Sequence, residues 1–194
     1  GIDSDTFEKT STAIKTRGFW LGTNLLTALI AASVINIFKE TLEQVIFLAV
    51  LMPIIASMGG VAATQTLTIT VRGLALGQIV RANYLYIFNR ELMVGISNGF
   101  IWAVILSLIA CSWFQDWLLA WVICLSMIIN LVAGVLSGMG IPILLKGLKM
   151  DPAVAGSVIV TTVTDVIGFF SFLGLATYFY SCLLYTSDAA DDWD

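Results

Sequence analysis

Five long apolar runs dominate the sequence and limit what it can fold into. Each has at least about 18 residues, so a helix rising about 1.5 Å per residue can cross a hydrocarbon core of roughly 30 Å. Backbone polar groups in lipid must be satisfied internally, which favours helices. The predicted fold is therefore an all-α membrane protein with five transmembrane helices. The runs are Phe19–Phe38, Val45–Val71, Leu92–Trp113, Trp117–Leu145 and Pro152–Leu184.

Composition agrees with a lipid environment. Of the 194 residues, 59% are hydrophobic and 11% are charged, against about 25% charged in soluble domains. The sequence has no histidine, and its three cysteines have no CxxC spacing. These features exclude a His-based catalytic triad, His-ligated zinc and a CxxC redox site, so we predict that the protein is not an enzyme. A net charge of −4 without a basic stripe argues against a nucleic-acid partner.

The basic residues predict the orientation, because Lys and Arg near span ends are retained on the cytoplasmic side. Only Lys39 of the 9 basic residues lies between the first and second runs. The others precede the first run or lie between the second and third or the fourth and fifth. We therefore predict a multi-pass plasma-membrane protein with a cytoplasmic N-terminus and an outside C-terminus. Those others are Lys9, Lys15, Arg17, Arg72, Arg81, Arg90, Lys146 and Lys149.

The remaining segments are short. Residues 1–18 are predicted to form a cytoplasmic linker helix, 19–184 the five-span transmembrane domain, and 185–194 a disordered acidic tail. Part of that tail resembles translated sequencing-adaptor sequence and receives no function. Residues 73–90 mix apolar and polar side chains and predict an interfacial amphipathic connection. Asp151 is expected to cap the start of the fifth span.

Asp165 is the ionisable residue that lies deep inside a predicted span. A charged side chain there costs about 2.5–3.5 kcal/mol on insertion scales, so it persists where it meets a partner or a water-filled path. Ser157 and Thr161 share its helix face, and no Lys or Arg lies within a predicted span. Two interpretations stay open: the carboxylate fastens neighbouring helices through hydroxyl groups, or it meets a cation from outside the chain.

The second run contains a helix weak point followed by a polar half. Pro53 removes an intrahelical donor, and Gly59 and Gly60 lower helix stability. Broken backbone at membrane depth is tolerated where it lines a water-filled cavity, so we predict freed carbonyls that face an ion. The alternative is a packing kink with close helix approach. The polar residues that follow are Thr64, Gln65, Thr66, Thr68 and Thr70.

The fourth run carries small or polar residues at successive intervals of four, which is typical of a helix-packing surface. They are Ser126, Asn130, Gly134 and Gly138, and Asn130 is expected to make a structural hydrogen bond. Glu91 stands at the cytoplasmic mouth of the third run, where it could be solvated.

The polar groups predicted inside the membrane offer oxygen ligands. Oxygen donors suit hard cations such as Mg²⁺ or Ca²⁺, with Mn²⁺ following. Because Mg²⁺ dehydrates reluctantly, a site with one carboxylate is expected to contact a hydrated ion through its waters. A two-fold dimer would bring two copies of Asp165 to one axis.

Two ordered motifs resemble the MgtE family of magnesium transporters and channels. The first is PIIASMGGVAATQ from Pro53, continuing into VRGLA from Val71. The second runs from Ile141-Pro142 through Asp151-Pro152-Ala153 to TTVTDVIG, which starts at Thr161. With the five-span layout, the resemblance covers residues 7–180. It departs from the family at Val61, where the family commonly has Asn. These residues do not include the family's cytosolic N-terminal and CBS domains that sense Mg²⁺, so we expect either an excised membrane domain or a short branch of the family.

The resemblance implies a homodimer whose pore lies between the two subunits, which makes residues 19–184 a pore domain. Asp165 of each chain would contact a hydrated Mg²⁺, with Mn²⁺, Co²⁺ or Ca²⁺ as possible further ions. Backbone carbonyls of Gly59, Gly60 and Thr161 would complete the metal contacts. Further possible pore-lining residues are Thr64, Ser157 and Glu91.

Three functions remain open. The first is a dimeric channel or transporter that moves Mg²⁺ down its electrochemical gradient. The second is a proton- or sodium-coupled exchanger in which Asp165 alternates between a proton or Na⁺ and the metal. The third is a non-conducting structural membrane subunit. An intramembrane aspartyl protease is disfavoured, because it needs two carboxylates that share a proton and the spans offer one.

Overall fold

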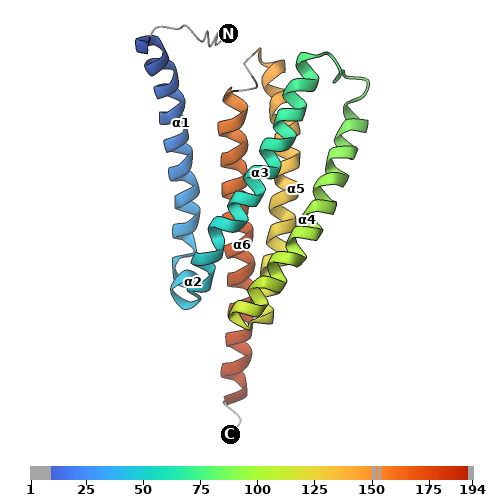
Figure 1. The fold of residues 1–194 in the computed structure, drawn as a ribbon. Coiled ribbons are helices and arrows are strands. Elements are labelled where there is room, and N and C mark those ends of the chain that lie inside the picture. Colours follow the sequence, from blue (N-terminus) through green and yellow to red (C-terminus); the bar gives the residue numbers. More distant parts are fainter. Residues whose placement is uncertain (1–9, 150–151, 153, 192–194) are drawn as a thin grey trace.

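A computed structural model describes residues 10–149, 152 and 154–191 (Figure 1). Those residues form helices and no strand, which confirms the all-α class. Five of the helices are long and apolar enough to cross a membrane, as predicted, and α2 is a short helix between the first two. The helices are α1 (Thr10–Ile37), α2 (Lys39–Gln44), α3 (Phe47–Ala75), α4 (Tyr84–Phe114), α5 (Trp117–Gly147) and α6 (Val154–Asp191).

The long helices alternate in direction, so the start of α1 and the end of α6 lie at opposite ends of the bundle (Figure 1). The ends of α3 and α5 lie at the same end of the bundle as the starts of α1, α4 and α6. This arrangement fits five successive membrane crossings. Which end faces the cytoplasm stays a prediction from the distribution of Lys and Arg.

Two predicted connections are continuous with spanning helices. Residues 10–18 are helical and form the first turns of α1, and residues 84–90 form the first turns of α4. Neither stretch contains proline, so nothing in the backbone stops the helix. Their predicted cytoplasmic and interfacial positions stay predictions. Residues 1–9 and Asp151, with its predicted capping role, lie outside the described residues.

The acidic tail is also helical as far as it is described. Helix α6 continues to Asp191, whereas the sequence predicts disorder from residue 185. The segment from 185 to 191 contains neither Gly nor Pro and includes two alanines, so its backbone can extend the helix before it.

The turn between α3 and α4 is fixed by local hydrogen bonds. Gly77 has a positive φ of 66°, which glycine adopts without steric cost. The Asn83 side chain accepts a hydrogen bond from the backbone N–H of Val80 at 2.9 Å and donates one to the carbonyl of Gln78 at 2.8 Å. The connection between these two spanning helices is therefore a short closed turn.

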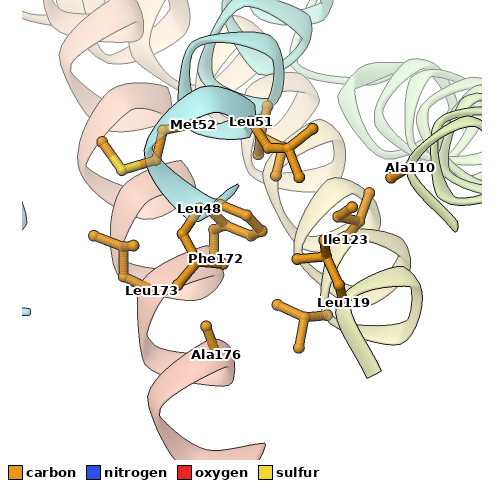
Figure 2. Close-up of a cluster of buried hydrophobic side chains, with 11 residues drawn as sticks. Leu48, Leu51, Met52, Ala110, Leu119, Ile123, Phe172, Leu173 and Ala176 are labelled. Carbon is orange, nitrogen blue, oxygen red and sulfur yellow. The ribbon is translucent and has the colours of Figure 1, made fainter. Parts of the chain in front are cut away.

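Helix α5 is the centre of the bundle and packs against α3, α4 and α6, while α1 packs against α6 (Figure 1). At one end of the bundle, large side chains of α3, α5 and α6 converge in a core around the fully buried Phe172 (Figure 2). In lipid such packing stabilises the helix bundle through van der Waals contact rather than through exclusion of water. The core includes Leu48, Leu51, Met52, Leu119, Ile123, Leu173 and Ala176.

The small residues of α5 pack against α3 at backbone distance, as predicted. A methyl group built on Gly134 would lie 2.7 Å from the carbonyl oxygen of Gly59, and Gly138 packs equally tightly against Ala63. Asn130 makes the expected structural hydrogen bond, because its Nδ2 donates to the carbonyl of Ile55 at 2.8 Å. We call Asn130, Gly134 and Gly138 the α5 seam.

A carboxylate joins the α4–α5 turn to α6. One oxygen of Asp116 caps α5 by accepting hydrogen bonds from the backbone N–H groups of Leu118 at 2.8 Å and Leu119 at 3.1 Å. The other oxygen accepts a hydrogen bond from the hydroxyl of Tyr180. The end of the α6 span is therefore fixed to the start of α5.

Replacing Tyr180 by Phe should lower the stability of the bundle. The change removes a hydrogen bond to a charged group, which contributes about 1.5–3 kcal/mol when it is buried and less when it is partly exposed. We expect the melting temperature in detergent to fall by a few degrees, at roughly 2–4 °C per kcal/mol for a chain of this size. Tyr178→Phe is the matched control, since Tyr178 is 69% exposed; equal melting temperatures for the two variants would contradict the role of this bond.

Candidate ion-binding groove

An open groove of about 670 Å³ lies between α3 and α6. The α3 residues that line the groove recur every three to four positions, so they lie on one face of the helix and follow the groove along it. The α6 wall contributes Thr161. The lining residues on α3 are Ser57, Gly60, Val61, Thr64, Gln65, Thr68 and Ile69.

The groove brings together three of the predicted site residues, Gly60, Thr64 and Thr161. Gly60 lies where the two helices approach, because a methyl group built on it would come 3.9 Å from the Thr164 hydroxyl oxygen. Thr164 is fully buried and directly precedes Asp165 in α6. The glycine of α3 and the acidic segment of α6 therefore meet at one level of the bundle.

Gly59 has a different environment from Gly60 and does not line the groove. Its carbonyl oxygen approaches Gly134, and a methyl group on Gly59 would overlap the side chain of Asn130. Within one chain the Gly59 carbonyl faces α5 rather than the groove, and its predicted contact with an ion stays a prediction. Neighbouring helix residues differ by about 100° in direction, so one glycine faces α5 while the next faces the groove.

Helix α3 is not broken at the glycines. It is α-helical through Pro53, Gly59 and Gly60, so the expectation of a break at the glycines is wrong. Pro53 is the seventh residue of α3, beyond the first four whose N–H groups lack an intrahelical partner, so it leaves one carbonyl without its helix donor but does not end the helix. The two glycines are held by packing against α5 and α6. Polar atoms reach the groove from side chains instead, and the carbonyl of Gly60 accepts a hydrogen bond from the Thr64 hydroxyl at 2.8 Å.

Asp165 lies one helical turn after Thr161 on the same face of α6, close to the middle of the candidate span Ala155–Tyr180. Its side chain is partly exposed. No hydrogen bond or ion pair joins the Asp165 carboxylate to another residue in the described part of the chain. Within one chain, the helix-fastening interpretation therefore has no bond to support it.

Two of the possible pore-lining residues lie outside the groove. Glu91 is 5% exposed on α4, a helix that packs chiefly against α5 rather than α3 or α6. Ser157 is exposed on α6 one turn before Thr161, and its carbonyl accepts a hydrogen bond from the Thr161 hydroxyl at 2.8 Å. Neither residue lines this groove of the single chain, and their predicted place in a pore between two subunits stays a prediction.

Five groove residues were not assigned a site role from the sequence: Ser57, Val61, Gln65, Thr68 and Ile69. With Gly60 and Thr64 they recur at intervals of three or four residues along one helix face, which could have identified them once that face was known to be open. Val61, the departure from the family pattern, is 52% exposed and contributes an apolar surface to the groove.

No group of three or more His, Cys, Asp or Glu side chains gathers within the described residues. The side-chain oxygen atoms of the lining residues belong to hydroxyl groups and the Gln65 amide, and Asp165 follows the lining residue Thr161 by one helical turn without being a lining residue itself. Such a set provides few direct metal ligands. It suits a cation that keeps most of its own water.

Five apolar helices, a groove between α3 and α6 that includes threonines and a glutamine, and a mid-span carboxylate without a bond in the described chain define a multi-pass membrane protein with polar groups at membrane depth. Residues 52–175 match the family model MgtE, described as a divalent cation transporter. The chain belongs to this family.

Three curated relatives are bacterial proteins named magnesium transporter MgtE. The Bacillus subtilis protein is 34% identical over 164 residues, covering 84% of this chain and 36% of the relative. The Thermus thermophilus protein is 29% identical over 157 residues, covering 81% and 35%. The Enterococcus faecalis protein is 28% identical over 160 residues, covering 82% and 35%. The chain therefore spans about a third of the length of these relatives.

The two adjacent glycines of α3 should respond oppositely to alanine. Gly59→Ala places a methyl group against Asn130 and should destabilise the bundle by about 1–3 kcal/mol, the usual cost of overpacking. Gly60→Ala has room for the methyl group and should keep or raise the melting temperature, because alanine favours the helix. Thermal unfolding in detergent compares the pair, and equal losses in both variants would disprove the assignment of opposite faces.

Proposed function

We propose that the chain forms a homodimeric pore domain that passes Mg²⁺ down its electrochemical gradient. The proposal is carried by the α3–α6 groove together with the Asp165 carboxylate, which lies one helical turn beyond the lining residue Thr161, near mid-span, and has no bond in the described chain. The family description as a divalent cation transporter supports it, and a transport role accounts for the expectation that the protein is not an enzyme.

The size of the groove favours a hydrated ion. Six water molecules occupy about 180 Å³ at roughly 30 Å³ each, whereas the groove has about 670 Å³. Mg²⁺ exchanges its water reluctantly, so a path this wide and this poor in carboxylates suits the intact hydrated ion. Mn²⁺, Co²⁺ and Ca²⁺ are the other divalent ions that oxygen contacts could admit.

A second copy of the chain would complete the path. The groove is open along one side. In a dimer with a two-fold axis beside this opening, the grooves of the two chains would face each other and the two Asp165 carboxylates would come together. Two negative charges would then face a dication. Cytosolic Mg²⁺-sensing domains are the further partners that the family resemblance suggests.

The membrane potential supplies the driving force. An inside-negative potential favours entry by about 2.3 kcal/mol per charge per 100 mV, and a dication gains about twice that. No coupling ion is needed. Uptake that persists after the proton and sodium gradients are abolished would distinguish this mechanism from an exchanger, in which uptake would stop.

Replacing Asp165 by Asn should abolish most of the Mg²⁺ flux into proteoliposomes held at a fixed negative potential. The amide keeps the size and hydrogen-bonding ability of the side chain but removes the charge that attracts the dication. We expect at least a tenfold loss, since about 1.4 kcal/mol of lost attraction gives that factor.

Glu43→Gln is the matched control, because Glu43 is an exposed carboxylate of α2 whose side chain is 67% exposed. It should conduct like the parent. Unchanged flux in Asp165→Asn would favour the structural-subunit interpretation, in which the amide replaces the carboxylate without loss. Absence of flux in the folded, dimeric parent would overturn the transport proposal itself.

A further inference from the structure

A second cavity, of about 180 Å³, lies between α3 and α4 and shares no lining residue with the ion-binding groove. Helices α3 and α4 each pack against α5 but barely touch each other, so a crevice opens between them. Its lining side chains are all apolar. They include Ile54 and Met58 of α3, Trp102, Ile105 and Ile109 of α4, and Met127 of α5. We call this cavity the α3–α4 crevice.

The crevice is open toward the outside of the bundle. Trp102 is 48% exposed, and Ile105 and Ile109 of the same helix are also exposed, whereas Met127 of α5 is fully buried. The exposed residues lie inside a candidate membrane span, so the surface that they form meets hydrocarbon rather than water. An apolar crevice at this depth fits an acyl chain.

The turn that joins α3 to α4 carries positive charge at one end of the crevice (Figure 1). Arg72, Arg81 and Arg90 are exposed there, and none of them forms an ion pair with another described residue. The carboxylate next to Arg90 in the sequence belongs to Glu91, which is 5% exposed. The described chain therefore leaves these guanidinium groups available to an anion outside it.

The distance between the arginines and the crevice matches one leaflet of a bilayer. Arg72 follows Met58 by 14 residues and Arg90 precedes Trp102 by 12, so the arginines lie about 21 Å and about 18 Å along their helices from the crevice. Half of a hydrocarbon core is about 15 Å thick, and the headgroup region adds roughly 5–7 Å. Ile54 and Arg72 are also five full turns apart and therefore share one face of α3.

We propose that the α3–α4 crevice, together with Arg72 and Arg90, binds an anionic phospholipid whose phosphate lies on the arginines and whose acyl chain ends in the crevice. The site is separate from the ion-binding groove, and the inference does not depend on transport. The bound lipid fills the space that α3 and α4 leave between them. It thereby supports α3, the helix whose neighbouring face lines the groove.

The headgroup chemistry favours a lipid with net negative charge. A guanidinium group presents paired N–H donors that match the oxygens of a phosphate. Phosphatidylcholine has the same phosphate but also a positive choline group, which the arginines repel. Phosphatidylglycerol has no such group, and basic residues at the membrane surface attract anionic lipids of this kind. Free phosphate could meet the arginines but would leave the crevice without an occupant.

The fluorescence of Trp102 tests the inference, because bromine atoms on an acyl chain quench a tryptophan that they contact. The purified full chain is reconstituted in phosphatidylcholine vesicles with increasing fractions of either phosphatidylglycerol or phosphatidylcholine, brominated near the chain ends. The difference between the parent and Trp102→Phe gives the Trp102 signal. Trp121→Phe gives the control signal, since Trp121 is 62% exposed near the opposite end of the bundle.

We expect half-quenching of Trp102 at a roughly tenfold lower fraction of brominated phosphatidylglycerol than of brominated phosphatidylcholine, since each basic residue at an anionic headgroup contributes about a fivefold factor. Trp121 should be quenched equally by the two lipids. Arg72→Gln combined with Arg90→Gln should remove most of the preference at Trp102. Lys39→Gln is the matched control, because it removes an exposed charge at the other end of the bundle, and it should keep the preference.

The other results overturn the site. Equal quenching of Trp102 by the two lipids indicates ordinary boundary lipid, and a preference that survives the loss of both arginines removes their role. Absence of Trp102 quenching by either lipid indicates that protein, such as a second copy of the chain, covers the crevice. Should the arginine variants fail to fold, the comparison of the two brominated lipids on the parent still decides. Absence of Mg²⁺ flux would leave each of these results unchanged.

Discussion

The contact of α3 with α5 at backbone distance is the constraint on which the rest of the structure depends. In lipid, two apolar helices gain little from leaving the solvent, so small residues that allow close approach decide which faces meet. The α5 seam gives α3 such a surface: Gly134 reaches the carbonyl of Gly59, and Asn130 bonds the carbonyl of Ile55. This contact fixes the rotation of α3 about its own axis.

Once α3 is fixed in this way, its opposite face becomes the functional one. Gly60, Thr64 and Thr68 turn away from α5 and line the groove, and α6 lies beside them with Thr164 next to Gly60. The hydroxyl hydrogens then bond the helix itself, which leaves oxygen acceptors at the surface. Packing on one face and polarity on the other are thus two results of the same rotation.

The second half of α6 is held by contacts that Asp165 does not have. Tyr180 bonds Asp116, the cap of α5, and Phe172, which lies between Asp165 and Tyr180 along the helix, is fully buried in the core. Asp165 lies in the part of α6 where no described side chain bonds its carboxylate. A rigid helix that carries an unpaired carboxylate at mid-span is consistent with a binding site that the protein positions without neutralising.

The sequence by itself determined the five spanning helices, because the length of an apolar run is a local property of the chain and must match the thickness of the bilayer. It also indicated the small-residue surface of α5 and the mid-span position of Asp165. It could not show that Gly59 faces α5 while Gly60 faces the groove, since direction around a helix depends on which neighbour packs against it. It also did not mark the exact helix ends at Thr10 and Tyr84, because hydropathy indicates the apolar part of a helix rather than where the helix starts. Only the tertiary structure decided which face of α3 is open, because that follows from contact with a helix some seventy residues away in the chain.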